Sequence, residues 1–300
     1  MAPVAINKQE TPCAKHTSDK NWRGIITGKV LLVEKFGTFA PVGISRLIIA
    51  LAQLGLGRGR LKLLFAQIWS WLNGDGSVDM LYHGLNFRLR PRQNTIESKM
   101  MFSSKQREKR ELEMIRHHLA NGGVFVDIGA NIGYYALNAA RLGAQKVIAI
   151  EPNPTIISRL NANIALNNLS SKIAVHDVAV GTRTGVAKLT IASKDFGSSS
   201  IVDHSVGKHH ISVPIMPLFE ILNTEKVAMA NVIKIDIEGM EDRALFPYFE
   251  AIAPECYPKL IVMEDGINVQ WERDILSWLL ANGYQSVERS RGNVMLTLTK

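Results

Sequence analysis

Short apolar runs alternate with helical patterns through the last two-thirds of the chain. Five runs of four or five residues are rich in valine and isoleucine, as is typical of buried strands: Val124–Ile128, Lys146–Ile150, Ile173–His176, residues 232–236 and Leu260–Glu264. Helices are predicted at residues 134–142, 155–167, 242–249 and 271–281, and an antiparallel hairpin at residues 286–298. This alternation predicts an α/β fold with a doubly wound, mostly parallel sheet.

The N-terminal part has a different pattern. Residues 1–21 are polar, which predicts a disordered tail. Residues 22–80 are predicted to form a helical, basic extension. Apolar positions recur at helical spacing through residues 44–72, where Gly55 and Gly57 separate two helices.

One domain is predicted over residues 81–300. It opens on a short hairpin at residues 81–89 and a helix at residues 104–120. An insertion at residues 188–217 contains two strand-like pieces around a flexible run, residues 196–200, that is rich in serine.

Charge is distributed unevenly along the chain. The net charge is +8, and residues 1–122 contain 19 lysines and arginines against 9 acidic residues. A basic N-terminal part favours either solvated surface charge or contact with an anionic partner, such as nucleic acid or acidic lipid. The helices of residues 44–72, with Trp69 and Trp71 near their end, either pack on their own domain or lie on a membrane surface.

Composition narrows the class of protein. Hydrophobic residues make up 46% of the chain, which is enough for a core and excludes a mainly disordered protein. Two cysteines are too few for a disulfide framework. The sequence shows neither a leader-like segment nor an apolar run of about 20 residues, which predicts a cytoplasmic protein, with a membrane-peripheral one as the alternative.

The first chemical motif follows the strand at Val124–Ile128. Gly129 permits a tight turn, Gly133 allows close packing where the next helix begins, and the N–H groups of that helix face a ligand. The glycine pattern of dinucleotide sites is not matched, because Asn131 and Tyr134 stand where glycine is needed. Asp127 disfavours a pyrophosphate and favours a cationic nucleoside such as S-adenosylmethionine.

Two further acids follow the next strands. Glu151 ends the second strand, where a carboxylate can accept hydrogen bonds from both ribose hydroxyls. Asp177 follows the third strand and is either a partner for the adenine amino group or a turn residue.

Three segments together resemble the FkbM family of S-adenosylmethionine-dependent methyltransferases: residues 127–133 (DIGANIG), 151–153 (EPN) and 235–241 (IDIEGME). The resemblance covers about residues 81–298. It implies a Rossmann-like, class I methyltransferase fold with a seven-stranded sheet and one antiparallel strand. It also implies O-methylation of sugars, polyketides or other small molecules, and adds Asn131 and Asn153 to the cofactor residues. Met240 and Phe219 depart from the family pattern, which points to a divergent acceptor pocket.

The second motif, residues 232–239, is an apolar strand followed by the acidic residues Asp236 and Glu238. Asp236 lies where ligands of such sheets bind, and is the candidate that orients or deprotonates the acceptor. Lys234 shares its side of the strand and can hold the charge of Asp236. The alternatives for Asp236 are a helix cap or a contact with the methionine end of the cofactor. Glu238 and Glu264 are the further candidates for substrate contact or support, and Glu238 is also a structural candidate. Because no histidine accompanies these acids, no metal is expected, and an oxygen-ligand metal site is the minor alternative.

Three functions fit these features. The first is an S-adenosylmethionine-dependent O-methyltransferase that acts on a sugar, glycan or other small polyhydroxylated acceptor, without nucleic acid as a partner. The second is a nucleic-acid methyltransferase with the basic N-terminal part as a clamp, although the usual Asn/Asp-Pro-Pro-aromatic motif is missing. The third is a membrane-surface or partner-binding protein with a vestigial nucleoside site. The oligomeric state is left open.

Overall fold

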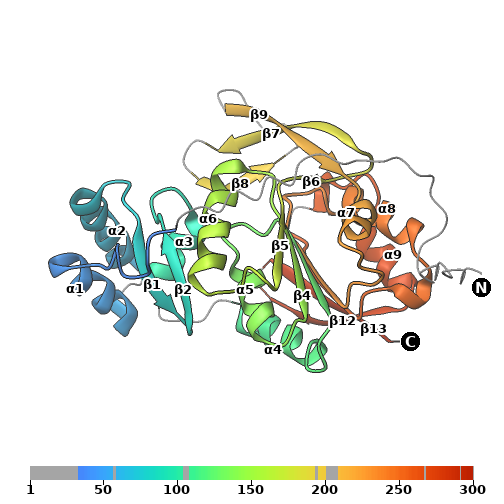
Figure 1. Cartoon of the computed structure of the whole chain (residues 1–300), viewed down its shortest axis with the longest axis horizontal. Coiled ribbons are helices and arrows are strands. Elements are labelled where there is room, and N and C mark those ends of the chain that lie inside the picture. The colour runs from blue at the N-terminus through green and yellow to red at the C-terminus, as the bar shows by residue number, and fades with distance from the viewer. Residues whose placement is uncertain are drawn as a thin grey trace, which may run out of the picture.

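A seven-stranded sheet between two layers of helices forms the centre of the molecule (Figure 1). The computed structural model describes residues 33–56, 59–103, 108–192, 195–200, 209–266, 268–290 and 292–299. The predicted disordered tail, residues 1–21, lies outside these described residues.

The sheet has the predicted topology. Its strands are β3 (Val124–Ile128), β4 (Lys146–Ile150), β5 (Ile173–His176), β10 (Val232–Ile235), β11 (Leu260–Glu264), β12 (Tyr284–Arg289) and β13 (Asn293–Leu298). The spatial order is β12-β13-β11-β10-β3-β4-β5. In this sheet β13 alone runs opposite to the other six strands. From β3 the strand order continues through β4 to β5 on one side of the sheet, whereas from β10 it continues through β11 on the other side. The strand order therefore reverses between β3 and β10.

Alternating side chains of the strands build two separate cores. Phe125 and Val147 face one helix layer, whereas Val126 and Ile148 face the other. The first layer contains α4 (Lys109–His118), α5 (Tyr134–Arg141) and α6 (Pro154–Leu166). The second contains α7 (Leu218–Thr224), α8 (Glu241–Ala251) and α9 (Ile275–Ala281). Two short 3-10 turns complete this part of the chain, Pro254–Cys256 and Asn268–Gln270.

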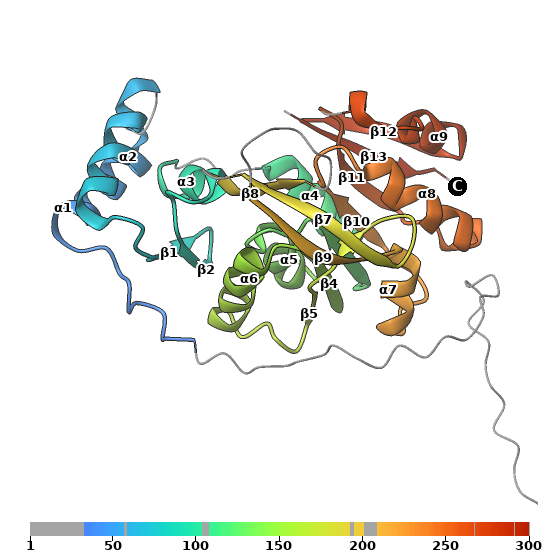
Figure 2. The ribbon, with the colours of Figure 1, turned by 90° about the horizontal axis from the view of Figure 1, so that it is seen from above.

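The helical pattern predicted for residues 44–72, within the N-terminal extension, is confirmed in the described residues. It consists of α1 (Gly43–Leu51), a π-helical turn (Ala52–Leu56) and α2 (Gly59–Asn73). Gly55 breaks the helix with a φ of 103°, at the predicted position. The two helices stand at one end of the molecule (Figure 2). No helix among the described residues is long and apolar enough to cross a bilayer.

The hairpin β1 (Val78–Tyr82) and β2 (Leu85–Leu89) begins three residues before the predicted domain boundary. It packs on α6, where the side-chain oxygens of Asn163 and Asn167 accept hydrogen bonds from the backbone of Arg88 and Asn86. We therefore propose that the hairpin as a whole belongs to the domain that follows.

Two predicted helices need correction, and one helix was not predicted. The helix predicted at residues 104–120 is shorter, because α4 spans Lys109–His118, and a further helix, α3 (Thr95–Met101), precedes it. The helix predicted at residues 271–281 begins only at Ile275, because the Asp274 side chain caps it by accepting from the Ser277 N–H at 3.0 Å.

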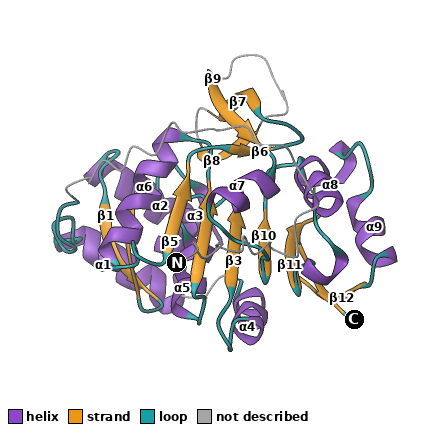
Figure 3. Cartoon of the chain, turned by 45° about the vertical axis from the view of Figure 1, so that its right-hand side comes forward, coloured by secondary structure: helices purple, strands orange, loops and turns teal. Residues whose placement is uncertain are grey.

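The insertion forms a small sheet of its own, with the order β6-β9-β7-β8. Its strands are β6 (Ala179–Val180), β7 (Gly185–Ala192), β8 (Asp195–Ser200) and β9 (His209–Met216). The two predicted strand pieces are confirmed, but the predicted flexible run is wrong, because its backbone pairs with β7. The small sheet lies beyond the ends of the central strands (Figure 3).

Because β3 and β10 approach closely, a larger residue in place of Gly129 is expected to destabilise the protein. The φ of Gly129 is 79°, and a Cβ there would overlap the carbonyl oxygen of Asp236. Gly129→Ala is expected to lower the free energy of unfolding by about 1–2 kcal/mol for the left-handed backbone, plus roughly 1–3 kcal/mol for the overlap. The matched control is Gly292→Ala, where φ is 102° but nothing lies within 4 Å. Equal losses for both variants in urea unfolding would contradict the close approach.

Candidate active site

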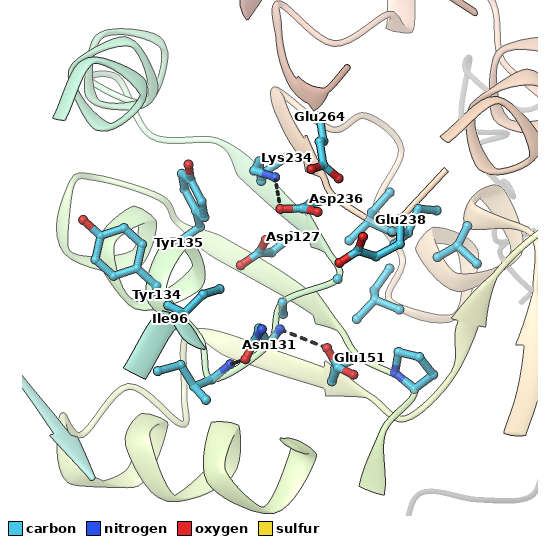
Figure 4. A pocket seen from close by; sticks show the side chains of 18 of the residues that line it. Ile96, Asp127, Asn131, Tyr134, Tyr135, Glu151, Lys234, Asp236, Glu238 and Glu264 are labelled. Carbon is cyan, nitrogen blue, oxygen red and sulfur yellow. Dashed lines mark hydrogen bonds and ion pairs between the residues drawn. The ribbon is translucent and has the colours of Figure 1, made fainter. Parts of the chain in front are cut away.

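A cavity of about 310 Å³ opens at the carboxyl ends of β3, β4 and β10, where the strand order reverses (Figure 4). This is the place at which doubly wound sheets bind their ligands. Eight of the eleven predicted site residues line it: Asp127, Gly129, Asn131, Glu151, Lys234, Asp236, Glu238 and Glu264.

Asp127 lies on β3 with 1% of its surface exposed. It is in register with Lys234 on β10, and its carboxylate accepts a hydrogen bond from the Ala136 N–H at the start of α5. Burial raises the pKa of Asp127 to about 7, although the Lys234 ammonium opposes the shift. Its Oδ2 has no hydrogen-bond partner among the described residues.

Glu151 is held by the backbone on both of its oxygens. The Asn131 N–H donates to Oε2 and the Asn153 N–H donates to Oε1, each at 3.0 Å. Burial raises the pKa of Glu151 to about 7. Each carboxylate oxygen has a second lone pair, so this fixed group can still accept hydrogen bonds from two ribose hydroxyls.

Three predicted cofactor residues lie outside the cavity lining. Gly133 begins α5 with a φ of 91°, and a Cβ there would meet Leu137 and Leu160. Asn153 is fully buried and caps α6 by accepting from the Thr155 N–H at 3.0 Å.

Asp177 is exposed and comes directly before Val178, which lines the cavity. The structure therefore gives Gly133 and Asn153 positioning roles, while a cofactor contact of Asp177 stays a prediction.

Gly129 also differs from expectation. The absence of a side chain there leaves space for the backbone carbonyl of Asp236, which follows β10, as well as for a ligand.

The second motif brings a cation and two carboxyl groups together. Lys234 Nζ lies 3.2 Å from Asp236 Oδ2, as expected for residues on one side of a strand. Lys234 is in register with Val262 on β11, so Asp236 lies beside Glu264, and these two side chains share a hydrogen bond. The Asp236 side chain is 43% exposed, whereas Lys234 is 2% exposed.

The two carboxyl groups titrate in opposite directions. Burial works to raise the pKa of Asp236, but the Lys234 ammonium and the hydrogen bond with Glu264 outweigh it, and the pKa is lowered. Burial and the negative charge of Asp236 raise the pKa of Glu264. Near neutral pH the pair therefore holds one proton, on Glu264, and one charge, on Asp236.

Glu241 has the structural role predicted for it. Its Oε1 accepts from the N–H groups of Ile237 and Gly239 at 3.0 and 3.3 Å, and its Oε2 accepts from Trp271 Nε1 at 2.8 Å. Asp236 does not cap α8, because that helix begins at Glu241 with Met240 in the capping position.

Tyr135 is a cavity residue that sequence reasoning missed. Its hydroxyl is buried without a partner among the described residues, and Lys234 Nζ lies 5.2 Å from its ring centroid. Three of the five such orphaned side-chain atoms in the described part of the chain line the cavity: Asp127 Oδ2, Tyr135 Oη and Glu264 Oε2. Buried polar atoms without partners are costly, so this clustering indicates a ligand with polar groups.

Helix α3 is a second element of the site that sequence reasoning did not predict. The Asn94 side chain caps it, accepting from the Ile96 N–H at 2.9 Å, and donates to Asn131 Oδ1 at 2.8 Å. A buried ion pair of 2.8 Å between Glu97 and Arg159 ties the same helix to α6. Asn94 followed by Glu97 is a capping pattern that predicts a helix start at this position.

The candidate site is acidic, but its acids are spread over several strands. Within the described residues, no group of three or more histidines, cysteines, aspartates and glutamates is arranged to hold a metal ion.

The fold and the cavity at the reversal of strand order define a class of protein: a class I methyltransferase. The methyltransferase FkbM domain family matches residues 127–286, which is more than half of the chain. The chain belongs to the FkbM family of methyltransferases, and its methyl donor is S-adenosylmethionine.

The chain is also similar to individual proteins. A ribosomal protein L11 methyltransferase from Carboxydothermus hydrogenoformans is 36% identical over 64 residues, 21% of each chain. Methyltransferase sdnD from Sordaria araneosa is 32% identical over 92 residues, 30% of this chain and 36% of that protein. The chain thus spans about a fifth to a third of the length of these curated relatives. A crystal structure of methyltransferase FkbM from Methylobacillus flagellatus KT is 19% identical, covers 59% of this chain and 44% of that chain, and has a TM-score of 0.43.

Glu151 is expected to contribute to donor affinity. Glu151→Ala removes an acceptor for charge-assisted hydrogen bonds, each worth about 1.5–3 kcal/mol, so calorimetry should show S-adenosylmethionine binding at least about tenfold weaker. Glu151→Gln keeps the size of the side chain and one acceptor oxygen, and serves as a second variant in case Glu151→Ala misfolds. Asp177→Ala at the exposed neighbouring position should cost about threefold or less. Wild-type affinity in both Glu151 variants would refute the ribose assignment.

Donor affinity is also expected to rise with pH up to about 7. Asp127 and Glu151 have pKa values of about 7 without the donor, and a bound cation must lower them. Binding below pH 7 therefore releases protons, and affinity changes by up to about tenfold per pH unit for each proton released. Calorimetry in buffers of different ionisation enthalpy counts these protons. Proton uptake, or an affinity independent of pH between about 5.5 and 7, would contradict the two pKa values.

Proposed function

We propose that this chain methylates a hydroxyl group of a sugar, glycan or other small polyhydroxylated acceptor. The observation that carries the proposal is the ionised carboxylate of Asp236, half-exposed in the cavity and fixed by Lys234 at 3.2 Å. A hydroxyl acceptor needs a partner that orients its proton and removes it, and Asp236 meets that need.

Two properties of the cavity fit the methyl donor: its charges, and its buried polar atoms that lack a hydrogen-bond partner among the described residues. Glu151 suits the ribose hydroxyls, and Asp127 Oδ2, which lacks a partner in the described structure, suits the ammonium group. Bound S-adenosylmethionine supplies an electrophilic methyl group on a sulfonium centre. The negative charge of the lining stabilises such a cation without a phosphate cradle.

Asp236 is ionised but is a weak base, because Lys234 lowers its pKa. A weak base suffices for this reaction, since the hydroxyl proton becomes strongly acidic as its oxygen gains the methyl group. In the proposed mechanism Asp236 accepts the hydrogen bond of the acceptor hydroxyl and takes its proton at Oδ late in the transfer. Lys234 holds the carboxylate in position, and Glu264 stays protonated beside it.

The charge of the cavity supports a neutral acceptor over a nucleic acid. Six acids and two lysines are found among the described residues that line it: Glu108, Asp127, Glu151, Asp236, Glu238 and Glu264, with Lys99 and Lys234. Phosphates of a nucleic acid would be repelled at this mouth, whereas hydroxyl groups of a sugar would find acceptors. Transfer of label to RNA or DNA rather than to glycans or small molecules would overturn this part of the proposal.

Asp236→Asn keeps the size of the side chain but removes its charge and its ability to take a proton. Turnover is expected to fall by roughly 10²–10⁴, while affinity for S-adenosylmethionine changes little. The control Glu238→Gln changes another carboxylate of the cavity and should keep turnover within about fivefold. If donor affinity falls in Asp236→Asn while turnover at saturation is unchanged, Asp236 binds the cofactor instead.

Lys234→Met tests how Asp236 is kept ionised. Without the ammonium, the pKa of Asp236 rises, so the acidic limb of the rate profile is expected to move to higher pH. With saturating donor, the wild-type rate should already be on a plateau near pH 6, since the pKa of Asp236 lies below its usual range. Superimposable pH profiles of the two proteins would contradict the role given to Lys234.

The acceptor class is tested by methyl transfer from labelled S-adenosylmethionine to fractionated cell extracts, followed by mass spectrometry of the product. The proposal predicts a methyl ether on a hydroxyl group, formed by the wild type and much less by Asp236→Asn. A methylated nitrogen or carbon in the product would refute O-methylation.

A further inference from the structure

Exposed apolar side chains gather on the helical extension. Fifteen large hydrophobic residues of the described chain are exposed, and nine of them lie within residues 42–72. Trp71 is 84% exposed and Leu54 is 81% exposed. The nine are Val42, Ile44, Leu47, Leu54, Leu56, Leu61, Leu64, Trp71 and Leu72. Exposed apolar side chains concentrated in one segment in this way indicate an interaction surface.

The exposed residues follow helical spacing. Ile44 and Leu47 are three residues apart on α1, and on α2 Leu64 follows Leu61 by three residues and Trp71 follows Leu64 by seven, which is two helical turns. Each helix therefore presents an apolar outer stripe along its length.

A separate set of side chains holds the two helices in place. Ile48, Ile49 and Trp69 are buried in the larger core, and Asn73 Nδ2 donates to Ser45 Oγ at 2.9 Å, joining the end of α2 to the start of α1. The outer stripes are thus not needed for packing within the extension, and they remain available for a partner.

Charge selects the kind of partner. Residues 36–74 contain four basic residues, Arg46, Arg58, Arg60 and Lys62, and no acidic residue. A second copy of this chain would bring the same positive charge to the same surface, and a nucleic acid would leave the apolar stripes without contacts. An anionic bilayer satisfies both features, since its headgroups attract the basic residues and its acyl boundary accepts the apolar ones.

We propose that α1, the π-helical turn and α2 bind the surface of an anionic lipid bilayer with their exposed apolar side chains. The extension stands at the end of the molecule, beyond the β1–β2 hairpin, where it is free to reach a flat surface (Figure 2). The helices lie in the headgroup region rather than cross it, and the catalytic domain is held beside the membrane. This inference does not depend on the identity of the acceptor.

The test is co-sedimentation of the full chain with vesicles. One set consists of phosphatidylcholine alone, and the other contains about 30% phosphatidylserine. The wild type is expected to bind the anionic vesicles at least about tenfold more tightly, and salt should weaken this binding. The double variant Leu54→Glu/Trp71→Glu should bind them at least about tenfold less tightly than the wild type.

The matched control is Val186→Glu/Val269→Glu, in which two equally exposed apolar residues outside the extension, 76% and 89% exposed, receive the same charges. It should bind vesicles like the wild type. Calorimetry with S-adenosylmethionine confirms that each variant is folded, and Leu47→Glu/Leu64→Glu replaces the first variant if that one fails. No vesicle binding by the wild type, or equal binding by all variants, would overturn the proposal. So would a wild-type dimer that becomes monomeric in Leu54→Glu/Trp71→Glu without any vesicle binding.

Discussion

The buried ammonium of Lys234 is the interaction on which the site depends. It has only 2% of its surface exposed, on a strand between two others that end in carboxyl groups. A buried cation of this kind is stable only with an anionic partner, and Asp236 supplies it at 3.2 Å, while Asp127 lies in register with Lys234 on the next strand. Because strand register fixes the three side chains relative to one another, the central sheet itself sets the charge of the cavity.

This arrangement separates two tasks along one sheet edge. Just before the end of β3 and just after β4, burial raises the pKa values of Asp127 and Glu151 to about 7, so we propose that these acids gain their charge as a cationic donor binds. On β10, Lys234 keeps the following Asp236 ionised before a proton is transferred to it, while the next strand carries the protonated Glu264. In the proposed mechanism, carboxyl groups therefore serve both donor binding and acceptor orientation, because their surroundings differ.

Much of the central sheet was predictable from the sequence, and the reason is burial. β3, β4, β5 and β11 begin and end at the predicted residues, because strands covered on both faces are continuous apolar runs. The pairing of Lys234 with Asp236 was predictable as well, since side chains two residues apart share one side of a strand. Asp127, Glu151, Asp236 and Glu264 could be found because each comes near or just after the end of such a run.

Other features depend on contacts that local sequence does not reveal. β8 contains a run of three serines and forms a strand only through its pairing with β7. Tyr135 follows another tyrosine at the start of α5, and nothing in that dipeptide tells which hydroxyl is buried at the cavity. Asn153 and Gly133 belong to the motifs but act through helix capping and close packing, which only the packed structure distinguishes from ligand contact.

The most direct measurement is a carbon-13 NMR titration of the carboxyl groups, with Asp236→Asn and Glu264→Gln used to assign the two signals. The pKa of Asp236 is expected to lie below the usual range of an aspartic acid. The pKa of Glu264 is expected to lie well above the usual range of a glutamic acid. In Lys234→Met the Asp236 signal should move to higher pH. A titration in which Glu264 loses its proton first, or in which Lys234→Met leaves both signals unchanged, would contradict the central role of the ammonium.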